Sequence, residues 1–272
     1  MTGLVIVRGA GDLATGTILK LHAAGLRVLA AECAQPSAIR RAAALCEAVY
    51  DGAAEVEGVI ARRIDTPDEE HLTRCWERSE VPLVVDEALA CVSALRPAAV
   101  VDAILAKRNL GTTRAMAPIT VGLGPGFTAG ADVDAVIETM RGHDLGRILY
   151  AGAARPNTGV PGLIAGEGAR RVMHAPADGP MAHLSAIGDT VEEGQKIARV
   201  GDAPVYASLS GVLRGLIRAG YPVTKGLKIA DIDPRRDQKN NCFTVSDKAR
   251  CIAGGVLEAL LHLAHEKEVR LL

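Results

Sequence analysis

The chain has 272 residues, a formal net charge of −1 and 49% hydrophobic residues, and only 3% of its residues are aromatic. A near-neutral chain offers no basic surface for nucleic acid or acidic membranes, and few aromatic side chains are available for base stacking. The length favours two domains. There is no signal-peptide pattern and no apolar run approaching about 18 residues, so a cytoplasmic protein that does not enter the membrane is expected.

The six cysteines occur without a CxxC pair and without zinc-like spacing. Reduced thiols in a cytosol are therefore expected, and no metal site is predicted. Cys33 is a candidate for a chemical role because it lies beside Glu32 at the end of a predicted strand, where a ligand would bind. Most of the other cysteines are expected to be small core residues.

Residues 4–16 predict a strand, a tight turn and a helix, with the pattern GxGxxA at the turn. The first glycine of the pattern, Gly9, allows the turn, Gly11 leaves room for a pyrophosphate, and the small Ala14 lets helix and strand pack closely. A second predicted strand ends in Glu32, a carboxylate placed to accept hydrogen bonds from ribose hydroxyls. The pattern therefore predicts a bound dinucleotide or similar nucleotide. The alternative is a glycine-rich turn that binds nothing.

Strand-like and helical runs continue to alternate up to about residue 128, which predicts a parallel sheet with helices on its faces. Pro36 suits the first turn of a helix running to about residue 48. That helix would carry Arg40 and Arg41, interpreted either as solvated side chains or as phosphate ligands. Another helix is expected to begin at the N-cap Thr66 and to end near residue 79.

Residues 119–127 are predicted to form the last strand of this domain and to end in a Gly-Pro-Gly turn. That turn would open at the same carboxyl edge of the sheet as the first turn. We therefore assign residues 1–128 to a Rossmann-like nucleotide-binding domain. Its candidate cofactor-binding residues are Gly9, Gly11, Asp12, Ala14, Glu32, Gly124 and Gly126.

Residues 129–165 are predicted to form a polar connector in which arginine, histidine and carboxylates are interleaved with glycine. Glycine frees backbone N–H groups to donate and arginine donates to pairs of oxygen atoms, so this composition suits a loop that binds an anionic or polyhydroxylated ligand. A loop held by its own salt bridges is the alternative. The candidate ligand-binding residues are Arg141, His143 and Asn157. Glu138 and His143 are also candidates for acid–base catalysis.

Residues 175–232 contain two copies of one pattern, offset by 32 residues. The matching positions are Ala175 and Ala207, Gly179 and Gly211, Gly188 and Gly220, Val191 and Val223, and Gly194 and Gly226. Each copy predicts short strands joined by glycine turns and is too small to bury a face alone, so the two copies are expected to close on each other as a flattened β-barrel. The residue pattern of the two copies resembles that of biotinyl and lipoyl carrier domains, which have a barrel-sandwich fold. We assign residues 166–236 to such a β domain.

Carrier domains of this kind need a lysine at the tip of the hairpin between the two halves. Residues 201–205 occupy that tip and contain no lysine. No biotin or lipoyl group is therefore expected on this chain.

Residues 237–272 are predicted to contain a C-terminal helix with Ser246 as its N-cap. A charge cluster with Asp231, Asp233 and Arg235 precedes this segment. Two aspartates at this spacing suit Mg²⁺, but an ion-paired cluster with the neighbouring arginines is favoured. These three residues and Lys248, in the first turn of the helix, are further candidate ligand-binding residues.

Six motifs together resemble one family. They are RGAGDLATG at 8–16, LGPGFTAG at 123–130, VIETMRGHDLGR at 136–147, NTGVPG at 157–162, LKIADIDPR at 227–235 and SDKARCIAGGVLEA at 246–259. The family is the YqeB-type accessory protein of selenium-dependent molybdenum hydroxylase systems, and the resemblance spans nearly the full length. The motif residues are Gly9, Gly11, Asp12, Gly124, Pro125, Gly126, Glu138, Arg141, Gly142, His143, Asn157, Asp231, Asp233, Arg235, Ser246, Asp247 and Lys248.

The resemblance implies a maturation factor for a molybdenum hydroxylase of the xanthine dehydrogenase kind, acting on the molybdopterin cofactor or its selenium ligand. A related accessory family, XdhC, also carries a nucleotide-binding turn, which fits a cofactor-handling role. The expected cofactor is NAD or a molybdopterin dinucleotide. The expected partners are the hydroxylase apoenzyme or cofactor-maturation proteins, and homo-oligomerisation is left open.

Two other functions stay open at the level of sequence. One is an NAD-dependent oxidoreductase that acts on a small substrate. The other is a non-catalytic docking scaffold. The sequence does not decide whether the protein is an enzyme.

Overall fold

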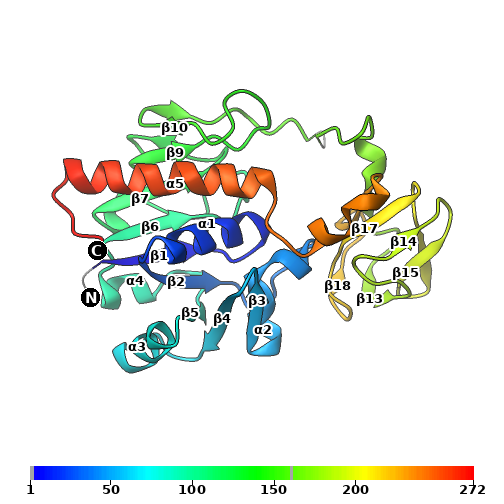
Figure 1. The fold of residues 1–272 in the computed structure, drawn as a ribbon, viewed down its shortest axis with the longest axis horizontal. Helices are drawn as coiled ribbons and strands as arrows, with labels where there is room; N and C mark the ends of the chain where they lie inside the picture. Colours follow the sequence, from blue (N-terminus) through cyan, green and yellow to red (C-terminus); the bar gives the residue numbers. More distant parts are fainter. Residues whose placement is uncertain (1–2, 160–161) are drawn as a thin grey trace. The chain divides into compact units, whose positions relative to one another are not determined.

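The computed structural model describes residues 3–159 and 162–272. The chain forms two compact units. Unit 1 comprises residues 1–36, 44–157 and 245–272, and unit 2 comprises residues 37–43 and 158–244. The first, middle and last parts of the chain therefore build unit 1 together, as the blue, green and red segments of Figure 1 show.

Unit 1 is built on a nine-stranded sheet in the order β10-β9-β7-β6-β1-β2-β5-β4-β3. Its strands are β1 (Leu4–Arg8), β2 (Arg27–Glu32), β3 (Ala53–Val56), β4 (Val59–Ile64), β5 (Val81–Val85), β6 (Ala99–Asp102), β7 (Ile119–Leu123), β9 (Ala135–Ile137) and β10 (Ile148–Leu149). Neighbouring strands from β4 to β9 are parallel, whereas β3 and β10 pair antiparallel at the two edges. This confirms the predicted mixed α/β class with a large, mostly parallel sheet.

Helices cover both faces of this sheet. They are α1 (Asp12–Ala23), α2 (Ala48–Asp51), α3 (Glu69–Glu77), α4 (Cys91–Leu95) and α5 (Asp247–Glu266). Side chains alternate between faces along a strand, so Leu4 and Ile6 of β1 pack with Leu72 of α3 and Cys91 of α4 in one apolar cluster. On the other face α5 packs along α1 and over β7 and β9 (Figure 1). The C-terminal helix is therefore an integral layer of unit 1.

Three local predictions were wrong, and in the first of them tertiary contacts outweigh local propensity. The helix predicted from Pro36 is replaced by short 3₁₀ turns, η1 (Arg41–Ala43) and η2 (Leu45–Glu47). Residues 37–43 belong to unit 2, where the buried Arg40 guanidinium donates to the backbone carbonyls of Asn241 and Thr244 at 3.0 and 2.9 Å. Arg41 likewise donates to the carbonyl of Leu216 at 3.1 Å. Both arginine side chains therefore bind backbone carbonyl groups of unit 2.

The other two corrections concern element boundaries. Helix α3 is capped by Asp68, whose carboxylate accepts from the His71 N–H at 2.9 Å, so Thr66 and Pro67 lie outside the helix. The large sheet also continues beyond residues 119–127, because β9 and β10 add to its edge. Strand β9 has only three residues, and so short a buried strand gives no periodic signal in the sequence.

Unit 2 consists of two four-stranded antiparallel sheets, in the orders β12-β19-β17-β14 and β16-β15-β13-β18. The strands are β12 (Val172–His174), β13 (Gly179–His183), β14 (Thr190–Val191), β15 (Lys196–Val200), β16 (Ala203–Tyr206), β17 (Gly211–Leu216), β18 (Pro222–Val223) and β19 (Lys228–Asp233). The predicted offset of 32 residues relates the first residues of β13 and β17, of β14 and β18, and of β15 and β19. The repeat predicted from the sequence is therefore a repeat of strands.

The two copies exchange their short strands. Strand β14 of the first copy pairs with β17 of the second, and β18 of the second pairs with β13 of the first. Backbone hydrogen bonds follow the same rule: the N–H of Gly188 donates to Leu213 at 2.8 Å, and that of Gly220 donates to Met181 at 2.7 Å. Each copy thus completes the sheet of the other, which explains why neither buries a face alone.

Candidate ligand site at the carboxyl edge of the sheet

Several predicted site residues of unit 1 lie at one edge of the large sheet. Strands β1, β6, β7 and β9 run parallel, so the segments that follow them, including residues 9–11 and Glu138, emerge at the same edge. Helices α1 and α5 also begin close to one another. A Cβ atom added to Gly16 would lie only 2.8 Å from the Cβ of Ala249. The first N–H groups of a helix have no intrahelical partner. Those of α1 and α5 therefore lie in the same region of unit 1.

The turn after β1 uses its two glycines differently. Gly9 has φ +97°, and an added Cβ would lie 3.3 Å from the backbone of Ala103, so only glycine suits this position. Gly11 is the N-cap of α1 with φ −68°, and an added Cβ would meet no atom within 4 Å. Ala14 is buried in the first turn of the helix. The open space beside Gly11 at the helix N-terminus is the feature that suits an anion.

The Glu32 carboxylate already has backbone partners. Its Oε2 atom accepts from the N–H of Ala10 at 2.7 Å, and its Oε1 atom accepts from the N–H of Cys33 at 2.8 Å. Glu32 therefore ties the end of β2 to the glycine turn. A ribose hydroxyl would have to share this carboxylate with those two N–H groups.

The Cys33 thiol is a poor nucleophile in this environment. Burial raises its pKa to about 11, and the neighbouring Glu32 carboxylate acts in the same direction. The thiol is consequently protonated near neutral pH, whereas nucleophilic cysteines need a depressed pKa.

The polar segment after β9 is organised by the Glu138 carboxylate. Glu138 is buried and accepts from the N–H groups of Thr139, Met140 and Arg155 at 2.7, 2.7 and 2.9 Å. His143 lies on the surface, and no hydrogen bond to Glu138 joins the two side chains within residues 3–159 and 162–272. Glu138 therefore shapes the loop, and the structure does not assemble the pair considered for acid–base catalysis.

Close backbone contacts fix this loop against α5. An added Cβ on Gly255 would lie 2.3 Å from the carbonyl oxygen of Gly146, and one on Gly146 would lie 2.8 Å from the Cys251 sulfur. Glycine at both positions lets the loop and the helix approach. Arg141 of the loop forms two hydrogen bonds with the Asp247 carboxylate at 2.8 and 2.9 Å, at the first residue of α5.

Lys248 is the half-buried cation of this region. Burial lowers its pKa, the Arg141 guanidinium lowers it further, and the carboxylates of Asp12, Glu138 and Asp247 act in the opposite direction. The net effect is a lowered pKa, caused mainly by burial, for an ammonium group in the first turn of α5. A bound anion would favour the charged form of this ammonium group.

The glycines of the second turn serve packing. An added Cβ on Gly124 would lie 2.5 Å from the Thr139 hydroxyl, and one on Gly126 would lie 2.6 Å from the backbone of Arg108. Both have positive φ, at +75° and +114°. These glycines bring three loops of the carboxyl edge together and leave no open space of the kind found beside Gly11.

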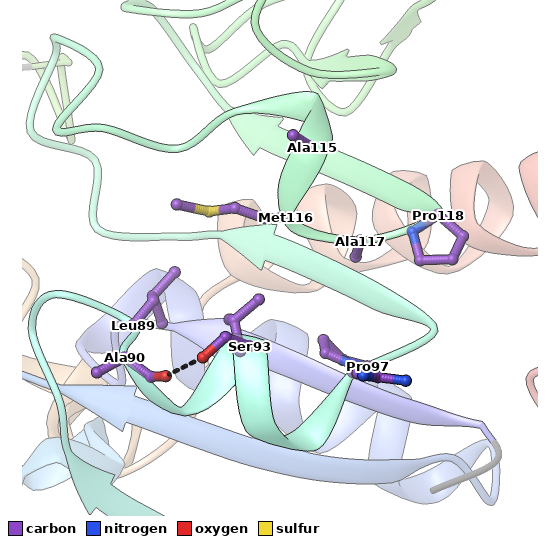
Figure 2. Close-up of a pocket in the computed structure, with 10 residues that line it drawn as sticks. Leu89, Ala90, Ser93, Pro97, Ala115, Met116, Ala117 and Pro118 are labelled. Atoms are coloured by element: carbon purple, nitrogen blue, oxygen red, sulfur yellow. Dashed lines mark hydrogen bonds between the residues drawn. The ribbon is translucent and has the colours of Figure 1, made fainter.

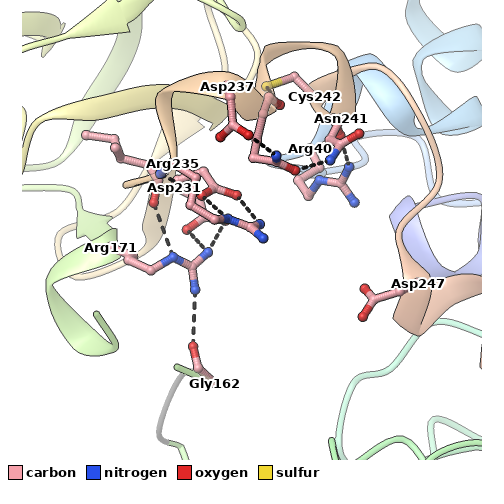
Figure 3. A network of polar contacts seen from close by, with 12 residues as sticks. Arg40, Gly162, Arg171, Asp231, Arg235, Asp237, Asn241, Cys242 and Asp247 are labelled. Atoms are coloured by element: carbon pink, nitrogen blue, oxygen red, sulfur yellow. Dashed lines mark hydrogen bonds and ion pairs between the residues drawn. The ribbon is translucent and has the colours of Figure 1, made fainter. Parts of the chain in front are cut away.

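The candidate residues of unit 2 form a partly buried ion-pair network, drawn in Figure 3. Arg171 donates to both carboxylate oxygens of Asp231 at 2.8 and 3.1 Å, and Arg235 donates to both oxygens of Asp233 at 2.9 and 2.8 Å. Among the described residues no group of three or more His, Cys, Asp or Glu side chains is arranged to hold a metal ion. The favoured interpretation of ion pairs with arginine is therefore the one observed. Asn157 lies on the surface at the end of the middle segment of unit 1.

Sequence reasoning missed a buried arginine at the same edge of the large sheet. Arg8, the last residue of β1, pairs with Asp102 at 3.1 Å and with the Thr112 hydroxyl at 3.0 Å, while its second amino group donates to the carbonyls of Glu87 and Leu110. Its Nε atom has no hydrogen-bond partner among the described residues. The sequence signal that could have indicated this pair is that two apolar strands each end in a charged residue, Arg8 and Asp102.

An apolar groove lies away from these residues. It encloses about 570 Å³ between α4 and the 3₁₀ turn η3 (Arg114–Met116), and Leu89, Val92, Met116 and Pro118 line it (Figure 2). Pro97 and Pro118, which precede β6 and β7, also line the groove, and none of its lining residues belongs to the segment from Gly9 to Gly16. It is thus separate from the glycine turn.

No helix in the described part of the chain is both long and apolar enough to cross a bilayer. No protein-family model matches the sequence. Solved structures with weak similarity include an aspartoacylase family protein from Mesorhizobium loti, at 13% identity and a TM-score of 0.29 over 85% of this chain and 84% of that one. A succinylglutamate desuccinylase from a Silicibacter species matches at 16% identity and a TM-score of 0.24 over 85% and 84%. TM-scores this low carry no information about the chemistry of this chain.

The sequence itself has a much stronger match. It is 51% identical over 264 residues to the uncharacterized protein YqeB of Escherichia coli strain K12, a region that covers 97% of this chain and 48% of YqeB. The chain thus spans about half the length of this relative. Over these residues the chain is a homologue of YqeB.

Proposed function

We propose that unit 1 binds a nucleotide-type ligand through its pyrophosphate, at the turn between β1 and α1. The observation that carries this proposal is the contrast between Gly9, which is enclosed by backbone, and Gly11, which faces open space at a helix N-terminus. Lys248 adds a positive charge within electrostatic reach of Asp12, the first residue of α1, and its lowered pKa reflects a charge that burial leaves poorly solvated. The strand order also reverses between β1 and β6, where ligands of open α/β sheets commonly bind.

The ligand we propose is NAD or a molybdopterin dinucleotide, since both contain a pyrophosphate. Gly11 and the first turn of α1 would hold the phosphates, and Lys248 would compensate their charge. Glu32 fits a ribose diol only if it releases or shares the N–H of Ala10, so its part is smaller than the motif alone suggests. In this proposal unit 1 is a Rossmann-like domain.

In the cell we propose a role in maturation of a selenium-dependent molybdenum hydroxylase, with the apoenzyme or other maturation proteins as partners. Its support is the resemblance to YqeB-type accessory proteins, together with a site suited to the dinucleotide form of the cofactor. Whether any bond is made or broken is not part of the proposal, because Cys33 is protonated and Glu138 is held by three backbone N–H groups.

We also propose that unit 2 is a barrel-sandwich-type domain without a carried group. The exchange of short strands between the two repeat copies supports the fold. The turn between β15 and β16, at Gly201 and Asp202, offers no amine for attachment. An intact mass larger than the sequence mass by a biotin or lipoyl increment would contradict this part.

The decisive test of the proposed ligand is mass spectrometry of small molecules retained by natively purified protein. Retention of a dinucleotide that is lost from the Gly11→Val variant is the expected result. Titration calorimetry with NAD, NADP and a molybdopterin dinucleotide would then rank the ligands. Turnover of a small substrate with NAD would favour an oxidoreductase, and no heat with any ligand would favour a docking scaffold.

A further inference from the structure

A second basic site lies between β4 and α3, at the other end of the large sheet from β9. It is a cavity of about 260 Å³ lined by four arginines, Arg62, Arg63, Arg74 and Arg78, but by only two carboxylates, Asp65 and Glu80. Arginine is the side chain best suited to bind phosphate, because its planar guanidinium donates to two oxygens at once. Guanidinium groups therefore outnumber carboxylates in the lining of this cavity.

Two of the four arginines are already committed to the protein. Arg62 donates to both carboxylate oxygens of Glu80, at 2.5 and 2.6 Å, and Arg63 donates to the carbonyl of Val49 at 2.6 Å. The Arg62–Glu80 pair is electrically neutral. It therefore adds geometry to the cavity wall but little net charge.

Arg74 and Arg78 have no such partner. No side chain or backbone carbonyl in the described residues hydrogen-bonds or ion-pairs with either guanidinium. Arg74 lies in α3 and Arg78 is the C-cap residue of that helix, so the two are four residues apart, and their like charges at this spacing are mildly repulsive. The same spacing presents two adjacent forks to a shared anion.

The wall of the cavity places these charges close together. Burial and the Glu80 carboxylate raise the pKa of the Cys75 thiol, whereas the guanidinium groups of Arg62, Arg74 and Arg78 act in the opposite direction. Three guanidinium groups are thus within electrostatic reach of one buried sulfur atom. They converge on the cavity from β4 and α3.

We propose that this cavity binds the phosphate groups of a small phosphorylated ligand, with Arg74 and Arg78 as the binding forks and the Arg62–Glu80 pair as a fixed wall. The site is separate from the turn at Gly11 and does not depend on the function proposed above. Inorganic pyrophosphate is the simplest probe, because it offers two phosphate groups to two guanidinium forks.

The experiment is a calorimetric titration of the whole chain with pyrophosphate at low ionic strength. To remove binding at the glycine turn, it is carried out in the Gly11→Val background. Arg74→Gln with Arg78→Gln should weaken pyrophosphate binding by about tenfold or more, since each charge-assisted hydrogen bond contributes roughly 1.5 to 3 kcal/mol. Arg74→Lys with Arg78→Lys should give an intermediate affinity, because charge is kept while the fork is lost.

A matched control lowers the net charge equally at two positions that do not line the cavity. Lys20→Gln with Arg199→Gln removes two exposed cations that have no described partner and should leave the affinity unchanged. Added salt should weaken binding in the parent chain. Equal weakening by the control pair, an unchanged affinity after the two α3 substitutions, or no pyrophosphate heat in the Gly11→Val chain would each overturn the proposal. Comparison with ADP distinguishes a nucleotide from free pyrophosphate as the ligand.

Discussion

The Arg171–Asp231 pair of unit 2 and the Arg141–Asp247 pair of unit 1 use the same residue types but differ in burial and in hydrogen bonding. In unit 2 the side chains of Arg171 and Asp231 are only 6% and 8% exposed. Arg171 also donates to the carbonyls of Ile232 and Gly162. In unit 1 the side chains of Arg141 and Asp247 are 42% and 74% exposed, and Lys248 beside them has a lowered pKa. Removing one partner of a buried, fully hydrogen-bonded pair leaves a charge without compensation in the interior, whereas an exposed pair beside a half-buried lysine can exchange partners with a ligand at lower cost.

The largest expected effect concerns the open glycine of unit 1. Gly11→Val should abolish binding of the pyrophosphate-containing ligand while leaving the unfolding midpoint nearly unchanged, because its backbone is in an ordinary region and an added Cβ meets nothing within 4 Å. Calorimetry and thermal unfolding measure the two effects. Gly9→Val is the matched control and should destabilise the fold, because Gly9 has φ +97° and an added Cβ lies 3.3 Å from backbone. Undiminished ligand binding by Gly11→Val would mean that the turn between β1 and α1 does not bind the pyrophosphate.

The buried pair of unit 2 should give the largest effect on stability. Arg171→Ala leaves the Asp231 carboxylate buried without its main partner, which typically costs about 3 to 5 kcal/mol of unfolding free energy. Urea denaturation checks this. Arg170→Ala is a neighbouring control: Arg170 is 53% exposed and pairs with Glu167 and Glu193 on the surface, so the loss should stay within about 1 kcal/mol. Equal losses of unfolding free energy for the two variants would show that burial does not distinguish the Arg171 pair from the Arg170 pairs.

Lys248 should matter for binding more than for folding. Lys248→Gln is expected to weaken ligand binding by about ten- to a hundredfold, the range of one charge-assisted hydrogen bond. The affinity of the wild type should also fall with rising pH before the ordinary lysine pKa of 10.5 is reached, since the pKa in the free protein is lowered. Lys248→Arg should bind without this alkaline loss. A wild-type affinity that stays constant throughout the alkaline range would contradict a role for the Lys248 charge.

Asp233 provides a smaller, pH-dependent effect in the buried network. Burial alone would raise its pKa, but the hydrogen bonds from Arg235 outweigh burial and hold the pKa below its ordinary 3.8. The unfolded chain therefore binds a proton before the folded chain does. The stabilisation is present above about pH 4 and is lost as pH falls through the lowered pKa. Asp233→Asn should be less stable than the wild type near neutral pH, and its unfolding free energy should depend less on pH at acidic pH. Denaturation between about pH 2 and 5 measures both effects.

The sequence predicted features that depend on repeated or local patterns. The offset of 32 residues reappears in the strand starts of unit 2 because each position is held by the same backbone contact in both copies. The turn at Gly9 and Gly11 was also predicted, because its residue types follow from local backbone geometry. The N-cap of α5 at Ser246 was predicted for the same reason.

What could not be predicted depends on contacts between distant segments. Residues 37–43 join unit 2 through the Arg40 side chain and the Ile39 backbone. The Ile39 carbonyl accepts from the N–H of Leu216 and lies close to Gly215. No local sequence pattern predicts such a contact. The partners of Arg8 are likewise about 80 to 104 residues away along the chain. The proximity of Lys248 to Asp12 brings the two ends of the chain together. It became visible only once α5 was seen to pack on α1.

The smallest effect is expected at the exposed pair of unit 1. Asp247→Ala removes two hydrogen bonds to Arg141 and an acidic residue from the first turn of α5, yet both side chains are well exposed and solvent screens the pair. The loss of unfolding free energy should therefore stay within about 1 kcal/mol. Removing this carboxylate also leaves Lys248 and Arg141 less compensated, so the affinity for an anionic ligand should rise, by up to about tenfold at low salt. Stability and affinity thus move in opposite directions here, whereas at Arg171 only stability should change. A variant that loses both would show that Asp247 supports the structure of the site and does not merely compete with the ligand for its cations.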